Sequence, residues 1–157
     1  MGVAGCGKSS VAQAVAAVMG LPLVEGDAFH PPANVDKMAR GIPLTDVDRR
    51  DWLDTLARQL TPERPVVLTC SALKRVYRDR LRAAAPGLRF AFLRIDRADA
   101  VARVSARADH FFSPTLVDSQ FEALEPPDGE PGVLTLEATR PVAALADGIV
   151  RWWREAA

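Results

Sequence analysis

The sequence predicts an α/β domain in which a parallel sheet is flanked by helices. Short apolar runs of strand length alternate with amphipathic helical segments along the chain. A glycine-rich phosphate-loop motif joins directly to the first of these helices, and a content of 48% hydrophobic and 25% charged residues is typical of a globular protein. A length of 157 residues fits one domain, so we treat residues 1–157 as a single folding unit.

The first half of the chain contains three segments with apolar residues at helical spacing, and each is bounded by a start or stop signal. Gly20 can end the first helix, Pro32 can occupy the first turn of the second, and Thr45 with Asp48 forms a capping-box pattern for the third. The short apolar runs between them are typical of buried strands. We predict helices over residues 8–19, 32–41 and 45–60, and strands over residues 21–25 and 65–70.

The second half continues the alternation. Val101, Val104 and Ser105 are expected on one side of a helix, while Ser113-Pro114 and Pro141 can each open another. Proline and glycine between residues 125 and 131 indicate a loop. We predict strands over residues 88–95 and 133–137, and helices around residues 73–81, 96–107, 113–124 and 141–152.

Charge and composition exclude several classes of function. Twenty basic residues balance twenty acidic ones, so no overall positive field favours binding of nucleic acid or anionic lipid. The apolar runs are far shorter than the roughly 20 residues that a membrane span requires, and the N-terminus has no targeting pattern, so we expect a cytoplasmic protein. The two cysteines, Cys6 and Cys70, and the two histidines are too scattered for a structural zinc site.

The strongest motif is the phosphate loop at residues 2–9, Gly-Val-Ala-Gly-Cys-Gly-Lys-Ser, which satisfies G-x-x-x-x-G-K-[ST]. In such a loop the backbone N–H groups turn inward, the lysine reaches the β- and γ-phosphates, and the serine hydroxyl binds Mg²⁺. The helical segment that follows argues against a chance glycine-rich turn. We therefore predict ATP and Mg²⁺ as ligands, with the nucleotide held by Gly2, Gly5, Cys6, Gly7, Lys8, Ser9 and Ser10, and the metal by Ser9.

A phosphate loop normally follows a buried strand, yet here the motif begins at the second residue. We therefore expect the first core strand of the sheet to be missing. The alternatives are a start codon assigned too late, an upstream truncation, or a natural variant without this strand. In each case we expect unpaired strand edges and low stability of the chain as written.

Asp27 follows the second predicted element, at the carboxyl end of a strand, where open α/β sheets place their ligand-binding loops. A carboxylate at this position can orient a substrate hydroxyl and accept its proton during attack on a γ-phosphate. The alternative is a residue that only shapes the turn.

Further segments extend the pattern: residues 25–31 (Glu-Gly-Asp-Ala-Phe-His-Pro), 34–38, 41–49 (Gly-Ile-Pro-Leu-Thr-Asp-Val-Asp-Arg), 51–53, 70–78, 110–111 and 119–121. In order from about residue 2 to residue 127, they resemble the gluconokinase family of P-loop sugar-acid kinases. The resemblance implies a three-layer fold similar to that of shikimate and adenylate kinases, ATP-dependent phosphorylation of D-gluconate at the 6-hydroxyl to give 6-phospho-D-gluconate, and a homodimer. The chain departs from the family in the missing strand and in Cys6, where serine is more usual.

The resemblance also implies roles for individual residues. Asp27 would deprotonate the acceptor hydroxyl, and Lys8 would hold the transferred phosphate. Arg103 and Arg107 lie one helical turn apart before a lid at about residues 107–114, where they would act on the phosphates, and Arg140 would flank the adenine. The acceptor-binding set comprises Asp27, His30, Lys37, Arg49, Lys74, His110 and Gln120.

Among these cations we favour Arg49 for the gluconate carboxylate, because a guanidinium binds a carboxylate in a bidentate manner. For Arg49 the competing interpretation is a surface salt bridge, and for Lys74 it is a solvated helix start. Two other functions stay open: a P-loop kinase for another small molecule, such as a shikimate-like acceptor, and a non-catalytic nucleotide-binding module.

Overall fold

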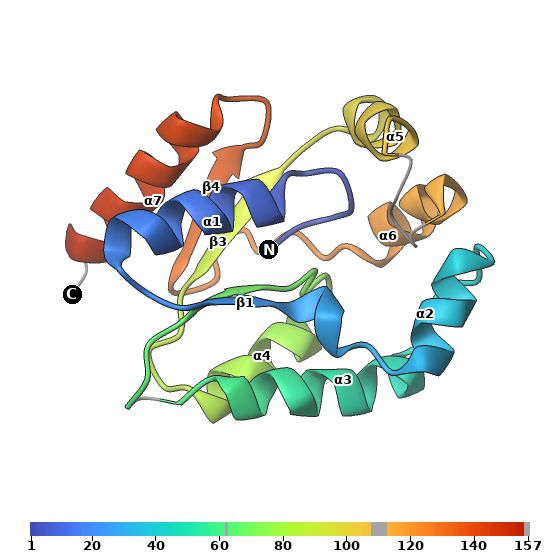
Figure 1. Cartoon of the computed structure of the whole chain (residues 1–157), viewed down its shortest axis with the longest axis horizontal. Coiled ribbons are helices and arrows are strands. Elements are labelled where there is room, and N and C mark those ends of the chain that lie inside the picture. Colours follow the sequence, from blue (N-terminus) through green and yellow to red (C-terminus); the bar gives the residue numbers. More distant parts are fainter. Residues whose placement is uncertain (62, 108–112, 156–157) are drawn as a thin grey trace.

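The computed structural model describes residues 1–61, 63–107 and 113–155, and it confirms the predicted α/β class and the order of elements (Figure 1). The strands are β1 (Leu23–Glu25), β2 (Val67–Thr69), β3 (Phe90–Arg94) and β4 (Val133–Glu137). The α-helices are α1 (Lys8–Met19), α2 (Pro32–Ala39), α3 (Asp46–Gln59), α4 (Arg75–Ala84), α5 (Arg97–Ser105), α6 (Val117–Ala123) and α7 (Val142–Glu155), with 3₁₀ turns η1 (Gly26–Phe29) and η2 (Pro114–Leu116).

Local signals account for most helix boundaries. The Thr45 hydroxyl accepts a hydrogen bond from the Asp48 amide at 3.2 Å, and the Asp48 carboxylate accepts one from the Thr45 amide at 2.9 Å, which completes the predicted capping box of α3. Gly20 ends α1 in the left-handed conformation, where glycine carries no steric penalty. The strands β1, β2 and β3 are shorter than their apolar runs because only part of each run is paired with a neighbour.

The strands form two separate parallel sheets. β1 pairs with β2, with Leu23 opposite Val67 and Glu25 opposite Thr69. β3 pairs with β4 along its whole length, from Phe90 opposite Val133 to Arg94 opposite Glu137. Among the described residues no strand lies between β2 and β3, as expected from the position of the phosphate loop.

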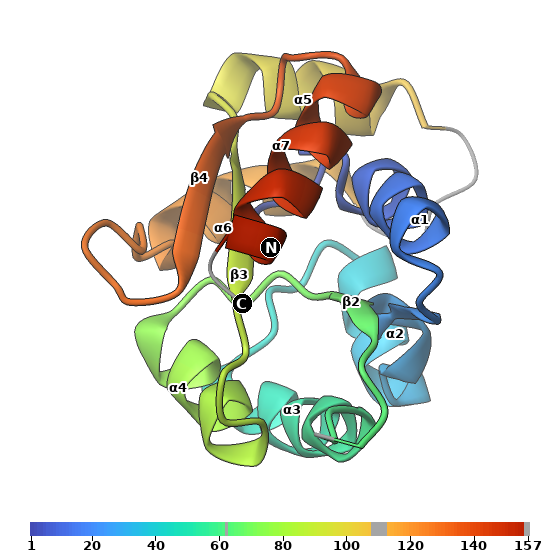
Figure 2. The ribbon, with the colours of Figure 1, turned by 90° about the vertical axis from the view of Figure 1, so that its left-hand side faces the viewer.

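A cavity of about 380 Å³ lies between the two sheets and is lined by residues of both. Figure 2 shows that β2 and β3 lie apart from one another. Its lining includes Leu68 of β2, Phe90 of β3 and Val15 of α1. Next to it, the Met1 ammonium donates to the Ala91 carbonyl at 2.6 Å, and the Met1 carbonyl accepts from the Leu93 amide at 3.0 Å. Met1 therefore makes the backbone bonds of a strand residue with β3.

Two hydrophobic cores lie on the two sides of this division. One surrounds α1, α6, α7 and the β3–β4 sheet, and the other surrounds α3 and α4 beneath β1 and β2 (Figure 1). The α5 helix contributes Ala100 and Val104 to the first core, whereas Val101 is 37% exposed and Ser105 is also exposed. Of the three residues expected on one side of this helix, Val104 alone is buried, because Ala100 and Val104, four residues apart, define the inward face.

No helix within the described ranges combines the length and the apolar character needed to cross a lipid bilayer.

Candidate active site

The phosphate loop curls around the N-terminus of α1. Gly5 and Gly7 adopt φ values of +81° and +88°, a conformation in which side chains are strained. A Cβ atom on Gly5 would also lie 2.8 Å from the Ala100 carbonyl oxygen. Backbone conformation therefore favours glycine at both positions, and the lack of space excludes a side chain at Gly5 as well. No side chain caps the N-terminus of α1, so its first amides remain available for an anion such as a phosphate group.

Lys8 and Ser9, the first two residues of α1, bond to the phosphate loop and to the end of β1, respectively. The Lys8 ammonium lies inside the loop, donating to the Gly2 carbonyl at 3.1 Å and the Val3 carbonyl at 3.0 Å. The Ser9 hydroxyl donates to the Glu25 carboxylate at 3.1 Å, and Glu25 also accepts from the Thr69 hydroxyl at 2.7 Å. A serine hydroxyl and a carboxylate are oxygen ligands of the kind that a partly hydrated Mg²⁺ ion takes, although no cluster of three acidic, histidine or cysteine side chains occurs among the described residues.

A small cavity of about 60 Å³ opens beside the loop and brings several predicted residues together. It lies between the loop, the residues that follow β1 and β2, and α3, α5 and α6. Among its lining residues are Gly5, Gly7, Lys8, Ser9, Asp27, His30, Arg49, Ser71, Arg107 and Gln120. Segments that are distant in sequence thus meet at one site.

Asp27 and His30 flank the cavity from η1, immediately after β1. The Asp27 side chain is 48% exposed, and its Oδ1 lies 3.8 Å from Nε2 of His30. The His30 ring stacks on Trp52 at a centroid distance of 4.2 Å, and its side chain is 3% exposed. Burial lowers the pKa of His30 to about 4; Asp27 opposes this effect and Arg49 adds to it. Within the described part of the chain, the buried Nδ1 of His30 has no hydrogen-bond partner.

Arg49 is the one of the three predicted acceptor-binding lysine and arginine residues that lines the small cavity, and no carboxylate pairs with it among the described residues. It is only 9% exposed, and its guanidinium lies 5.8 Å from the centre of the Tyr77 ring. A buried guanidinium of this kind favours an anionic ligand, because an unpaired buried charge is costly. The predicted alternative for Arg49, a surface salt bridge, does not occur among the described residues.

Lys37 and Lys74 are held by carboxylates at the N-terminus of α3 and do not line the small cavity. Lys37 donates to Asp48 at 2.7 Å, which lowers the pKa of that carboxyl to about 2. Lys74 donates to Asp46 at 2.8 Å, and this bond is the main cause of a lowered pKa for Asp46. Both lysines thus neutralise the acidic first turn of α3.

The predicted nucleotide-side residues are divided among different positions. Arg103 donates to the Gly5 carbonyl at 3.4 Å and to the Ala138 carbonyl at 3.2 Å, so it braces the outside of the loop, while Arg107 lines the cavity. Arg140 is exposed after β4. His110 and residues 108–112 of the predicted lid lie outside the described residues.

Gln120 of α6 contacts the loop directly, because its Oε1 accepts a hydrogen bond from the Ala4 amide at 2.7 Å. This contact fixes one wall of the cavity. We predicted an acceptor-binding role for Gln120 and did not foresee the bond to the loop.

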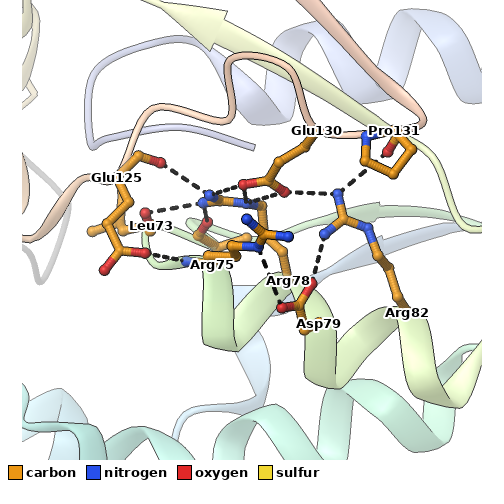
Figure 3. Close-up of polar contacts among 9 residues, drawn as sticks. Leu73, Arg75, Arg78, Asp79, Arg82, Glu125, Glu130 and Pro131 are labelled. Atoms are coloured by element: carbon orange, nitrogen blue, oxygen red, sulfur yellow. Dashed lines mark hydrogen bonds and ion pairs between the residues drawn. The ribbon is translucent and has the colours of Figure 1, made fainter.

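A buried ionic network supports the wall formed by the turn at residues 71–74 (Figure 3). Arg78 of α4 is fully buried and pairs with Glu130, which Arg82 also contacts at 2.8 Å. The bonds from Arg78 and Arg82 lower the pKa of Glu130 to about 2. The guanidinium of Arg78 also donates to the carbonyls of Ala72 at 2.9 Å and Leu73 at 3.0 Å.

Sequence reasoning missed several residues of this region. Ser71 lines the cavity, Glu25 accepts from Ser9, and Tyr77 lies beneath Arg49. The signal for Ser71 and Glu25 was present, because both lie at the carboxyl ends of parallel strands, as Asp27 does. Tyr77 lies in the segment 70–78 that contributes to the resemblance, but its helical spacing with apolar neighbours indicated a core residue.

The parallel sheets, the phosphate loop and the polar cavity beside it define a P-loop kinase fold. Consistent with this class, the family described as AAA domain matches residues 1–125. The chain is 39% identical to a gluconokinase of Gluconobacter oxydans over 155 residues, which cover 96% of this chain and 87% of that protein. It is 41% identical to the thermoresistant gluconokinase of Escherichia coli over 151 residues, covering 92% and 86% of the two chains.

A crystal structure of a gluconokinase from Sinorhizobium meliloti superimposes with a TM-score of 0.91 at 44% identity, covering 100% of this chain and 90% of that one. The chain belongs to the gluconokinase family of P-loop kinases, as the sequence motifs predicted.

Proposed function

We propose that the protein transfers the γ-phosphoryl group of ATP to the 6-hydroxyl of D-gluconate, giving 6-phospho-D-gluconate and ADP. The observation that carries this proposal is the small cavity in which the phosphate loop, the Asp27 carboxylate and the buried guanidinium of Arg49 meet. Family membership supports the same reaction. Two free buried thiols and the use of ATP favour a cytoplasmic location.

Each group has a role that follows from its surroundings. Asp27 is half-exposed at the cavity, so its carboxylate accepts the proton of the 6-hydroxyl as the hydroxyl oxygen bonds to the γ-phosphorus. The bond between the γ-phosphorus and the bridging oxygen breaks, and ADP leaves with that oxygen. Arg49 binds the carboxylate at the other end of gluconate, which fixes the direction of the acceptor.

Lys8, the loop amides and the N-terminus of α1 hold the phosphate charge, and Arg107 lies where it can add to them. Ser9, with Glu25 nearby, would hold Mg²⁺, which offsets phosphate charge when it is bound. Arg103 keeps the loop in shape through the Gly5 carbonyl. Phosphoryl transfer requires mainly positioning and electrostatic stabilisation, and these residues supply both.

The test is gluconate-dependent ADP release with MgATP, measured for the wild type and for Asp27→Asn. We expect Asp27→Asn to reduce kcat by about 10²- to 10⁴-fold, the usual contribution of a general base, with little change in nucleotide affinity. Asp36→Asn, at an exposed carboxylate of α2, is the matched control and should retain wild-type turnover. Turnover by Asp27→Asn close to that of the wild type would exclude the proposed role of Asp27.

A panel of acceptor acids tests the substrate itself. Gluconate should give the highest kcat/KM among sugar acids and shikimate. ADP release that no acceptor increases would instead indicate a nucleotide-binding protein without kinase activity.

A further inference from the structure

The turn that joins β2 to α4 has an unusual backbone. Ala72 adopts a φ of +45°, and it is the non-glycine residue with positive φ in the described part of the chain. An alanine in this left-handed region is strained relative to its ordinary conformations, because its Cβ atom crowds the backbone. Ala72 is also fully buried, so its carbonyl cannot be satisfied by bulk water. Something in the structure must therefore hold this turn.

Arg78 is the residue that holds it. One terminal nitrogen of its guanidinium donates to both the Ala72 and the Leu73 carbonyls, at 2.9 and 3.0 Å. The other donates to the Glu125 carbonyl at 3.0 Å, and Nε donates to Glu130 at 3.0 Å. A planar guanidinium with donors in a fixed fork can make all these bonds at once, which a lysine ammonium cannot.

The loop at residues 125–131 completes the clamp. The Glu125 amide donates to the Leu73 carbonyl at 2.9 Å, and its carboxylate accepts from the Arg75 amide at 2.6 Å, at the first residue of α4. Figure 3 shows Arg78 reaching from α4 between this loop and the turn. The turn at residues 71–74 is thus held between α4 and the loop.

The two ends of the turn lead into the active site. At one end, Ser71 lines the small cavity, and its carbonyl accepts from the Gly2 amide of the phosphate loop at 3.2 Å. At the other end, Lys74 donates to Asp46, which also accepts a hydrogen bond from the Tyr77 hydroxyl. The Tyr77 ring lies 5.8 Å from the Arg49 guanidinium, so we expect a shift of the turn to move Ser71 directly and Arg49 through Asp46 and Tyr77.

We propose that Arg78 is a positioning residue for acceptor binding: it holds the Ser71–Lys74 turn in its strained conformation and thereby sets the places of Ser71 and Arg49. This inference rests on the proposed function, because it takes gluconate to be the acceptor. Arg78 itself does not line the cavity, and it acts through the turn.

The main test is Arg78→Lys, which keeps the charge and loses the fork. We expect the KM for gluconate to rise at least tenfold, while the affinity for a fluorescent ATP analogue changes less than twofold. Glu130→Gln removes the carboxylate charge that orients the Arg78 guanidinium, so it should raise the KM for gluconate by a smaller factor. Arg82→Lys is the matched control, because Arg82 shares Glu130 and α4 with Arg78 but makes no bond to the turn. It should lower the melting temperature without changing the gluconate KM.

A second readout does not depend on the acceptor. Hydrogen exchange in the nucleotide-free proteins should be at least tenfold faster at residues 71–74 in Arg78→Lys and Glu130→Gln than in the wild type, with Arg82→Lys unchanged. Failure of the wild type to phosphorylate gluconate would refute the proposed function, whereas this measurement would still test the clamp.

Equal rises in the KM values for ATP and gluconate, or wild-type exchange at residues 71–74, would overturn the positioning role. If Arg78→Lys does not fold, an unchanged gluconate KM and unchanged exchange in Glu130→Gln would overturn it as well.

Discussion

Protonation of His30 should destabilise the folded protein below neutral pH. The ring is stacked on Trp52 with its side chain 3% exposed, and its pKa is lowered to about 4 in the folded state. In the unfolded chain the pKa returns to about 6.5. Between these two values the unfolded state binds a proton that the folded state does not, so stability from the neutral ring is lost as the pH falls from about 6.5 to 4.

The size of the effect follows from the two pKa values. A difference of about 2.5 pKa units corresponds to about 3 kcal/mol when the pH lies below both values. At pH 5 the unfolded chain is largely protonated and the folded ring largely neutral, so the loss relative to pH 8 is about 2 kcal/mol. Arg49 opposes protonation and Asp27 favours it, and burial is the largest of the three effects.

The assay is urea unfolding at pH 8 and pH 5 for the wild type and for His30→Phe, which keeps a ring on Trp52 but cannot titrate. Carboxylates also lose stability in acid, but they do so in both proteins and cancel in the comparison. We expect the wild type to lose about 2 kcal/mol more than His30→Phe. The reasoning would be refuted by equal losses in the two proteins, or by a His30 ring proton that titrates near pH 6.5 by NMR.

Two further predictions concern the acceptor site and the divided sheet. Arg49→Met should raise the KM for gluconate by about 10- to 100-fold, equivalent to about 1.4–2.8 kcal/mol. It should also reduce the preference for gluconate over an uncharged polyol of the same length. Steady-state kinetics with both compounds measure this preference, and an unchanged value would show that Arg49 does not bind the carboxylate. Fusing five valine and isoleucine residues before Met1 should place a strand in the cavity of about 380 Å³ between β2 and β3 and bury its apolar lining. Urea midpoints should rise relative to a glycine–serine extension of the same length, and equal midpoints would show that the cavity does not accept a strand.

Local patterns allowed much of the fold to be predicted. The phosphate loop, the capping box of Thr45 and Asp48, and the order of strands and helices depend on short-range signals, and the structure confirms them. The buried face of α5 could not be predicted in the same way, because Ala100 and Val101 are both apolar and only packing selects between them.

The candidate site could also be predicted only where short sequence patterns indicate its residues. Strand ends and the loop motif indicated Asp27 and Lys8, and the resemblance indicated Arg49. Lys37 and Lys74 pair with carboxylates of α3 that lie 11 and 28 residues away in sequence, so local patterns could not predict these pairs. Arg78 lies on a helix rich in arginine, where nothing in the sequence distinguishes a fully buried guanidinium from a solvated one.

The division of the sheet has a mechanical consequence for the active site. Asp27, His30 and Ser71 belong to the half built on β1 and β2, whereas Arg107 and Gln120 belong to the half that contains α5 and α6. The halves are joined at the loop by backbone bonds of Met1 and Gly2, by α1, which packs on both α7 and β2, and by the bonds from Arg78 and the 71–74 turn to residues 125–131. A nucleotide bound in this loop would contact residues of both halves, and its binding should therefore stabilise their placement relative to one another.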